Sequence, residues 1–324
     1  MKAFAYQVAT SEEHACKLLG EKAVALAGGT TLLNLMKNFV VQPDTVVCIT
    51  RLPGSDRIEA VGGGLKLGAN VRIADLAAHA DVRKSYAALA QAADNVASPQ
   101  IRNMGTIGGN LCQRPNCWYF TNERFDCWMR GGSTCPARDG ENEYHAILGN
   151  GGPCVMAHPS SLAPALIALG AKARIVGPGG AREVALGEFF VAPKADPRRE
   201  TVLAANEIVT HVLLGPGTPN SATYEVRSKE VDWALSVASV ALQIQNGSCT
   251  DAVVCLGAVA PTPWRSKEAE AALKGKAVSV ATAAAAAAAS VEGAKPLSQN
   301  AYKVATTKAA VERAILSAAG IARK

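Results

Sequence analysis

The stretch that decides the fold is "AVALAGGTT", residues 23–31. Its first five residues are typical of a short buried strand, and the paired glycines and threonines that follow predict a turn. A helical stretch over 32–38 and a second strand, "TVVCI" (45–49), come next. A strand, a glycine turn, a helix and a strand in this order predict a βαβ-like unit with a parallel pair of strands.

The same alternation extends in both directions along the chain. Upstream, Thr10 and Glu13 form a capping-box pattern, which predicts a helix that runs to about Leu19. Downstream, the pattern predicts a strand at 65–69, helices through 73–95, a helix at 160–170 and a strand at 172–176. We therefore expect an α/β (α+β) fold.

A second, smaller domain is expected after the glycine- and proline-rich segment "GPGTPN" (215–220). Asn246-Gly247 separates two apolar stretches, 235–245 and 249–260, and this dipeptide is a strong hairpin signal. Segments 281–290 and 301–316 are helical by propensity and periodicity. The pattern predicts an antiparallel sheet followed by helices.

Composition excludes several classes of function. The 324 residues are 49% hydrophobic and 19% charged with a net charge of +6, which is typical of a globular protein with two domains. No block of basic residues occurs, so nucleic-acid binding is disfavoured. No uninterrupted apolar run of about 18 residues occurs, so membrane insertion is not expected. The first twenty residues lack a secretory pattern, and we expect no signal peptide of the chain's own.

Two glycine loops share a chemistry. They are "AGGTT" (27–31) and "NMGTIGGN" (103–110). Glycine permits close approach of a ligand to the backbone, and threonine hydroxyls and successive N–H groups can bind phosphate oxygens. Both loops therefore suit a pyrophosphate, although each taken alone is equally typical of a structural turn. Neither fits the Rossmann or Walker fingerprint.

Cysteines gather in one segment. Five of the nine lie at positions 112, 117, 127, 135 and 154, and residues 117–135 also contain five aromatic rings. Four thiolates can bind zinc or an iron–sulfur cluster. Successive separations of 10, 8 and 19 positions after Cys117 differ from the close pairs of structural zinc sites, so zinc is disfavoured. His145 and His158 are alternative ligands, and Cys16, Cys48, Cys249 and Cys255 are expected to be buried thiols.

Five motifs together resemble a known family. They are "LAGGTTLL", "ASPQIRNMGTIGGNL", "PSSLAPALIALGA", "EIVTHVLL" and "GAVAPTPWRSKEAEAAL". Their order and spacing are similar to those of the FAD-binding subunits of molybdenum hydroxylases, over nearly the whole chain. The closest resemblance is to the [4Fe–4S]-containing flavin subunits of bacterial periplasmic aldehyde oxidoreductases and of 4-hydroxybenzoyl-CoA reductases.

The resemblance implies the domain organisation. Residues 1–217 would form an FAD-binding domain of the vanillyl-alcohol oxidase (PCMH) type, with subdomains at about 1–55 and 56–217 and an iron–sulfur insertion at about 111–157. Residues 222–324 would form a C-terminal domain of the CO dehydrogenase flavoprotein type.

The resemblance also implies the residues around FAD. Ser98 and Arg102 would support the second loop, while Ile208, Tyr224 and Lys229 would lie near the flavin. Ser161 stands where the family commonly has Asp, which removes an ionic contact to the adenosine end. The two loops would hold the pyrophosphate through Leu26, Ala27, Gly28, Gly29, Thr30, Thr31, Leu32, Gly105, Thr106, Gly108, Gly109 and Asn110.

For the insertion, the resemblance implies a [4Fe–4S] cluster on Cys117, Cys127, Cys135 and Cys154, with Cys112 as a bystander. The chain would be an electron-transfer subunit of an oxidoreductase and would contain no catalytic residue. Its partners would be a large subunit with the molybdenum cofactor and a small [2Fe–2S] subunit, with electrons passing to an external acceptor.

Two alternatives remain open at this point. One is the flavin subunit of a hydroxybenzoyl-CoA reductase-like or xanthine dehydrogenase-like enzyme, and the other is a non-catalytic nucleotide-binding scaffold with structural zinc. The complex would be periplasmic if a partner's twin-arginine signal exports it folded, and otherwise cytoplasmic.

Overall fold

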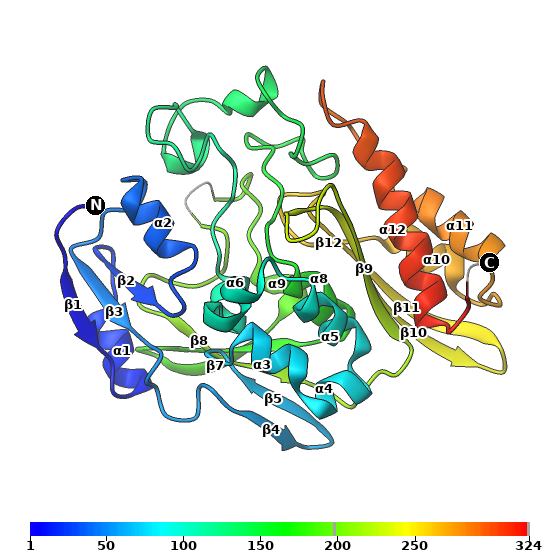
Figure 1. The fold of residues 1–324 in the computed structure, drawn as a ribbon, viewed down its shortest axis with the longest axis horizontal. Helices are drawn as coiled ribbons and strands as arrows, with labels where there is room; N and C mark the ends of the chain where they lie inside the picture. Colours follow the sequence, from blue (N-terminus) through cyan, green and yellow to red (C-terminus); the bar gives the residue numbers. More distant parts are fainter. Residues whose placement is uncertain (197–198, 323–324) are drawn as a thin grey trace.

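A computed structural model describes residues 1–196 and 199–322 and shows three sheets arranged side by side, with helices packed against them (Figure 1). The first sheet has the order β1-β3-β2, and its pairs are parallel. Its elements are β1 (Ala5–Val8), α1 (Glu12–Leu18), β2 (Ala23–Leu26), α2 (Leu32–Lys37) and β3 (Thr45–Cys48). The parallel pair expected from residues 23–49 is confirmed.

The start of α1 differs from the expectation. Ser11, and not Thr10, is the N-cap, and its hydroxyl accepts a hydrogen bond from the His14 N–H at 3.1 Å. The Thr10 hydroxyl instead lies 3.1 Å from Nδ1 of the His14 ring. Both residue types can cap a helix, so the pattern alone did not separate adjacent positions.

The second sheet has the order β4-β5-β8-β6-β7 and is antiparallel throughout. The parallel pairing of the first sheet therefore does not continue into the second sheet. Strands β4 and β5 form one hairpin and β6 and β7 another, and β8 pairs with β5 on one side and with β6 on the other. The strands are β4 (Ile58–Val61), β5 (Gly64–Gly68), β6 (Lys172–Gly177), β7 (Gly180–Ala185) and β8 (Ile208–Leu214). The helices of this region are α3 (Ile73–Ala78), α4 (Ala80–Ser85), α5 (Ala87–Asp94), α6 (Pro99–Met104), α7 (Ile107–Leu111), α8 (Leu162–Ala168) and α9 (Leu186–Phe189).

The third sheet is a four-stranded antiparallel meander, β12-β11-β10-β9. The predicted hairpin is confirmed, since Asn246 and Gly247 join β10 to β11 with φ of 51° and 77°. Helix α12 packs against β9, β10 and α11 (Figure 1). The elements are β9 (Ser221–Arg227), β10 (Ala234–Gln245), β11 (Ser248–Gly257), β12 (Trp264–Arg265), α10 (Lys267–Leu273), α11 (Val280–Ala289) and α12 (Tyr302–Ala318).

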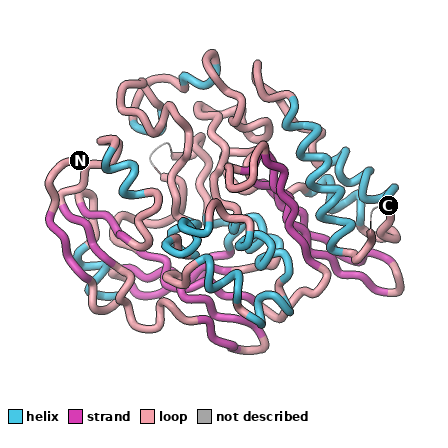
Figure 2. The backbone as a smooth tube through the Cα atoms, in the orientation of Figure 1, coloured by secondary structure: helices cyan, strands magenta, loops and turns pink. Residues whose placement is uncertain are grey.

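Between α7 and α8 the chain forms a long insertion that is mostly loop (Figure 2). Its short helical turns are η1 (Trp128–Arg130) and η2 (Pro136–Arg138). The last part of the insertion is bonded to the C-terminal region: the N–H of Ile147 donates to Val259 O at 2.9 Å, and the N–H of Lys295 donates to Ile147 O at 2.6 Å. The C-terminal region therefore supports the insertion from one side, through loops next to β11 and α12.

Lys303 of α12 is the central contact of this support. Its side chain is fully buried, and its Nζ donates to the carbonyls of Tyr144, His145 and Ala258 at 2.8, 3.2 and 2.7 Å. Asn300 donates to the same His145 carbonyl at 3.1 Å. Burial lowers the pKa of Lys303 to about 7.

We predict that Lys303→Met lowers the free energy of unfolding by about 2 to 3 kcal/mol, because buried carbonyls lose their donor. Lys308→Met, on an exposed position of the same helix, should change it by less than about 0.5 kcal/mol. Thermal and denaturant unfolding measure both.

A folded pKa below that of an unfolded lysine means that the unfolded chain binds more protons between about pH 7 and pH 10. The stability of the unmodified chain relative to Lys303→Met should therefore rise across that window, and a flat difference would contradict this.

Candidate functional site

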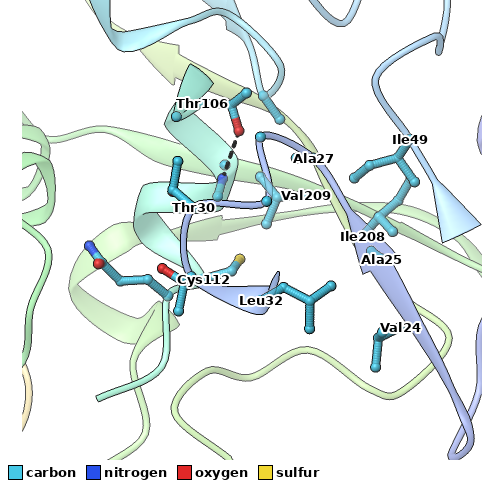
Figure 3. A pocket seen from close by; sticks show the side chains of 18 of the residues that line it. Val24, Ala25, Ala27, Thr30, Leu32, Ile49, Thr106, Cys112, Ile208 and Val209 are labelled. Carbon is cyan, nitrogen blue, oxygen red and sulfur yellow. Dashed lines mark hydrogen bonds between the residues drawn. The ribbon is translucent and has the colours of Figure 1, made fainter. Parts of the chain in front are cut away.

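The expected ligand loops bound a cavity of about 310 Å³ between the first and second sheets (Figure 3). Eleven of the residues named from the sequence line it: Ala27, Gly28, Gly29, Thr30, Thr31, Leu32, Gly105, Thr106, Gly108, Gly109 and Ile208. A second cavity of about 300 Å³ shares Thr30, Thr31, Gly105, Thr106 and Gly109 with it and adds Asn110 and Ser161. The two cavities form one elongated cleft with the glycine loops at its middle.

The two loops meet at Gly28. A Cβ built on this residue would lie 1.9 Å from the carbonyl oxygen of Met104, at the end of α6. No side chain larger than hydrogen fits there without separating the loops. Gly29 follows with φ of 75°, a conformation that glycine adopts readily.

The second loop is fixed from behind by the end of β5. The N–H of Gly108 donates to Ala69 O at 2.8 Å, and that of Ile107 to Val71 O at 3.0 Å. A Cβ on Gly108 would lie 2.9 Å from the Ala69 Cβ, so this glycine also serves packing. The Thr106 hydroxyl accepts the Gly109 N–H at 3.1 Å and caps α7 (Figure 3).

One end of the cleft is apolar. Ile208, at the start of β8, faces it together with residues that the sequence reasoning did not name: Val24, Ala25, Ile49, Leu203 and Val209 (Figure 3). Val24, Ala25 and Val209 lie within strands and Ile49 directly follows one, so the sequence pattern does not distinguish them from ordinary apolar strand residues. Such a wall suits one face of a flat ring system.

The remaining residues named from the sequence take different places. Ser98 caps α6 by accepting the Ile101 N–H at 3.4 Å, and Arg102 donates to the carbonyls of Val96 and Ala97 at 2.9 and 3.0 Å. Both therefore hold the segment before the second loop. Leu26 ends β2 behind the first loop.

Tyr224 and Lys229 lie off the cleft. The Tyr224 hydroxyl accepts a hydrogen bond from Arg313, whose guanidinium lies 5.0 Å from the Tyr224 ring centre. Neither residue lines the two cavities of the cleft. Arg227, which belongs to β9 like Tyr224, does line the cleft, and it forms an ion pair with the buried Glu225. Burial raises the pKa of Glu225, against the lowering effects of Arg227 and of the Ser161 hydroxyl.

Arg114 connects the cleft to the insertion and was also missed. It lines the first cavity, its Nε lies 2.9 Å from Glu200 Oε1, and its guanidinium lies 4.8 Å from the Phe120 ring centre. Burial raises the pKa of Glu200, and Arg114 opposes that rise. The sequence contained one indication that Arg114 belongs to the site, because Gln113 and Arg114 directly follow the loop motif "TIGGNLC" and both line the cavity.

The structure brings together the four cysteines chosen from the sequence. All four contact one apolar cluster that contains Leu35, Phe120, Met129 and Met156. The Cys154 thiol donates to Cys135, which lowers the pKa of Cys135 and raises that of Cys154. Burial raises the pKa of Cys117 to about 11, and the neighbouring Cys127 and Cys135 add to the rise.

Backbone N–H groups also approach these sulfurs. In each case a donor is the residue two positions further on: Tyr119, Met129, Ala137 and Met156. The backbone two positions further on also interacts with Cys48 and Cys249, which lie in strands elsewhere, so the grouping is what distinguishes the four. Hydrogen bonds to sulfur are a main influence on the potential of a thiolate-bound cluster.

The other cysteines and the histidines separate from this group. Cys112 lines the cleft, and burial raises its pKa to about 12. His145 does approach a cysteine, with its Nε2 3.2 Å from Cys117 Sγ, whereas His158 packs against Phe190 with ring centres 4.7 Å apart. Cys16, Cys48, Cys249 and Cys255 are buried, as expected.

Two features are absent from the described residues. In the part of the chain that the structure describes, no group of three or more His, Cys, Asp or Glu side chains is close enough to hold a single metal ion. Among the same residues, no helix combines the length and apolar character needed to cross a membrane.

Known families match most of the chain. Residues 2–215 match the FAD binding domain in molybdopterin dehydrogenase, and residues 222–318 match the CO dehydrogenase flavoprotein C-terminal domain. The chain is 39% identical over 281 residues to the aldehyde oxidoreductase FAD-binding subunit PaoB of Escherichia coli (strain K12), covering 84% of this chain and 86% of that protein.

Solved structures agree with this. A chain of carbon monoxide dehydrogenase from Hydrogenophaga pseudoflava is 28% identical with a TM-score of 0.77, over 98% of this chain and 97% of that chain. A chain of quinoline 2-oxidoreductase from Pseudomonas putida 86 is 25% identical with a TM-score of 0.78, over 99% of each chain.

Gly28→Ala tests the junction of the loops. We expect most of the bound flavin to be lost, because a Cβ 1.9 Å from the Met104 oxygen must push the loops apart. Gly20→Ala is the matched control, since its Cβ would meet nothing within 4 Å. The flavin-to-protein absorbance ratio of the purified variants gives the result, and equal flavin in both would refute the assignment.

Proposed function

Because the chain belongs to the FAD-binding subunits of the molybdenum hydroxylases, we propose that it is the FAD- and [4Fe–4S]-containing electron-transfer subunit of an aldehyde oxidoreductase. The chain is an oxidoreductase subunit, and its family shows that it binds FAD. The aldehyde substrate and the iron–sulfur cluster are the proposed parts. The proposed iron–sulfur cluster rests on one observation, namely that four cysteine thiols contact a single apolar cluster of side chains.

The cleft fits FAD in shape and in the order of its chemistry. The first loop offers backbone N–H groups for a pyrophosphate, and the two loops together offer the hydroxyls of Thr30, Thr31 and Thr106. The apolar end around Ile208 would cover the flavin ring, and the Asn110 and Ser161 end would take the adenosine. When bound, FAD exchanges electrons singly or in pairs.

The cysteine group fits an iron–sulfur cluster better than a single zinc ion. In a [4Fe–4S] cluster each thiolate binds a different iron, so the four sulfurs surround the cluster instead of meeting at one atom. Four cysteines that contact one apolar cluster of side chains supply the number of thiolates that such an iron–sulfur cluster needs. Phe120, Met129 and Met156 would exclude water, and the backbone N–H groups would stabilise the thiolates.

The partners follow from the family. Two relatives are named as the medium subunit of nicotine 6-hydroxylase and the medium chain of carbon monoxide dehydrogenase, so each is one chain of a larger enzyme. We propose that this chain receives electrons from a large molybdenum subunit and a small [2Fe–2S] subunit and passes them to an external acceptor. The complex would be periplasmic if a partner's twin-arginine signal exports it folded, and otherwise cytoplasmic. A 4-hydroxybenzoyl-CoA reductase-like subunit with reversed electron flow is the alternative.

The complex tests the substrate class. We expect the purified complex to reduce ferricyanide when aldehydes are added, and to contain one FAD and about four irons more than the [2Fe–2S] subunit accounts for. Metal analysis and steady-state kinetics measure these. Reduction of hydroxybenzoyl-CoA without aldehyde turnover would favour the alternative, and zinc in place of the additional iron would refute the cluster.

Single cysteine substitutions test the ligand set. Ala at 117, 127, 135 or 154 should lower iron content and abolish the paramagnetic signal of the reduced cluster, because Ala offers iron no donor. Cys112→Ala is the internal control and should retain the iron, since Cys112 lies in the cleft outside the group. Iron loss from Cys112→Ala together with iron retention in Cys117→Ala would show that the ligand assignment is wrong.

A further inference from the structure

A positive charge lies at the flavin end of the cleft. Among the described residues that line the first cavity, Arg114 and Glu207 are the charged ones. Arg114 does not line the second cavity, whereas Thr30, Thr31 and Thr106 of the glycine loops line both. Arg114 therefore lies on the flavin side of the loops that suit the pyrophosphate, away from the adenosine end.

The carboxylate of Glu207 is already occupied. It accepts hydrogen bonds from Nε and Nη2 of Arg182 at 3.1 and 2.8 Å and from the Ala204 N–H at 2.9 Å. The hydrogen bonds from Arg182 hold the pKa of Glu207 below its ordinary value. Arg182 itself does not line the first cavity. Both oxygens of Glu207 are thus engaged by protein donors, which leaves neither of them without a partner.

Arg114, in contrast, keeps donor groups for a ligand. Its Nε lies 2.9 Å from Glu200 Oε1, and within the described part of the chain Nη1 and Nη2 donate no hydrogen bond. The side chain is 31% exposed, and neither Nη belongs to the described polar atoms that are both buried and unpartnered. Both Nη groups are therefore accessible, on a residue that lines the cavity.

Two contacts hold the Arg114 guanidinium in place. Glu200 binds it on one side, and the fully buried ring of Phe120 lies 4.8 Å from it. Leu203, three positions after Glu200, lines the apolar end of the same cavity, so the ion pair connects Arg114 to the segment that carries this wall. A charge that is fixed before the ligand changes its own charge can stabilise that change without reorganisation.

Reduction changes the charge of a flavin ring and not that of the pyrophosphate. The oxidised ring is neutral, and uptake of two electrons and one proton from water leaves it with one negative charge. A fixed cation near the ring therefore stabilises the reduced state more than the oxidised state, which raises the reduction potential. A cation at the pyrophosphate would stabilise both states alike.

We propose that Arg114 faces the flavin ring and raises its reduction potential, and that Glu200 moderates this effect with its opposite charge. The inference goes beyond the proposed function and requires only that the chain binds FAD. It does not depend on the aldehyde substrate or on the iron–sulfur cluster. Arg114 would thus make the flavin a better acceptor for the electrons that reach this subunit.

The test measures the flavin reduction potential of the purified complex by equilibration with a reference dye. Arg114→Gln removes the charge and keeps a polar side chain, and Arg114→Lys restores the charge. Glu200→Gln removes the opposing charge. Arg83→Gln is the matched control, because Arg83 also pairs with a carboxylate, that of Asp94, but lines neither cavity of the cleft. The dissociation constant of oxidised FAD and the iron content are measured separately.

We expect Arg114→Gln to weaken the preference of the site for reduced over oxidised flavin by about tenfold, which corresponds to a potential about 30 mV more negative for a two-electron couple. Arg114→Lys should regain most of this shift, Glu200→Gln should shift the potential in the opposite direction, and Arg83→Gln should leave it unchanged.

Two results would overturn the proposal. Weaker binding of oxidised FAD by Arg114→Gln with an unchanged potential would place the guanidinium at the pyrophosphate. Shifts of the same sign in Arg114→Gln and Glu200→Gln would show that the ion pair only supports the cleft wall. Neither result bears on iron content or aldehyde turnover, so failure of this inference and failure of the proposed function are distinguishable.

Discussion

The structure depends on one close approach, that of the Gly28 backbone to the carbonyl of Met104. This contact joins the loop after β2 to the end of α6, and so joins the first sheet to the helices of the second. It sets the width of the cleft at its middle, where two loops supply the polar groups. The contact also holds the start of α2 in place, because the first loop ends at Thr31 and α2 begins at the next residue, Leu32. The absence of a side chain at Gly28 is thus as important for joining the two loops as any attractive interaction between them.

Helix α2 connects the cleft to the insertion. Leu35 lines the cleft and also belongs to the apolar cluster around the cysteines. Arg114 makes a second connection, since it lines the cleft and lies against Phe120 of the insertion. The two proposed cofactor sites are therefore neighbours that share side chains, which suits a subunit whose role is electron transfer.

Local signals were enough to predict most of the regular structure. The glycine turn after residues 23–27 and the Asn246-Gly247 hairpin are short-range features, and each determines its own backbone conformation. The antiparallel second sheet was not predicted, because β5 pairs with β8 across more than a hundred residues and no local pattern encodes that partner. The insertion was recognised from its cysteines and aromatic residues, because its loops show no periodic pattern of apolar residues. The place of Arg114 in the cleft was missed because Glu200 and Phe120 come to lie beside it only after the chain folds.

The support of the insertion by Lys303 and Asn300 has a consequence for biogenesis. The carbonyl of His145 receives its donors from Asn300 and from Lys303 of α12, which lie 155 and 158 positions further along the chain. Until those residues are synthesised and folded, the segment that precedes Cys154 lacks its anchor. The segment that carries the cysteine group can therefore reach its final conformation only after α12 has been synthesised, and a product that stops before α12 would leave the His145 carbonyl without these donors.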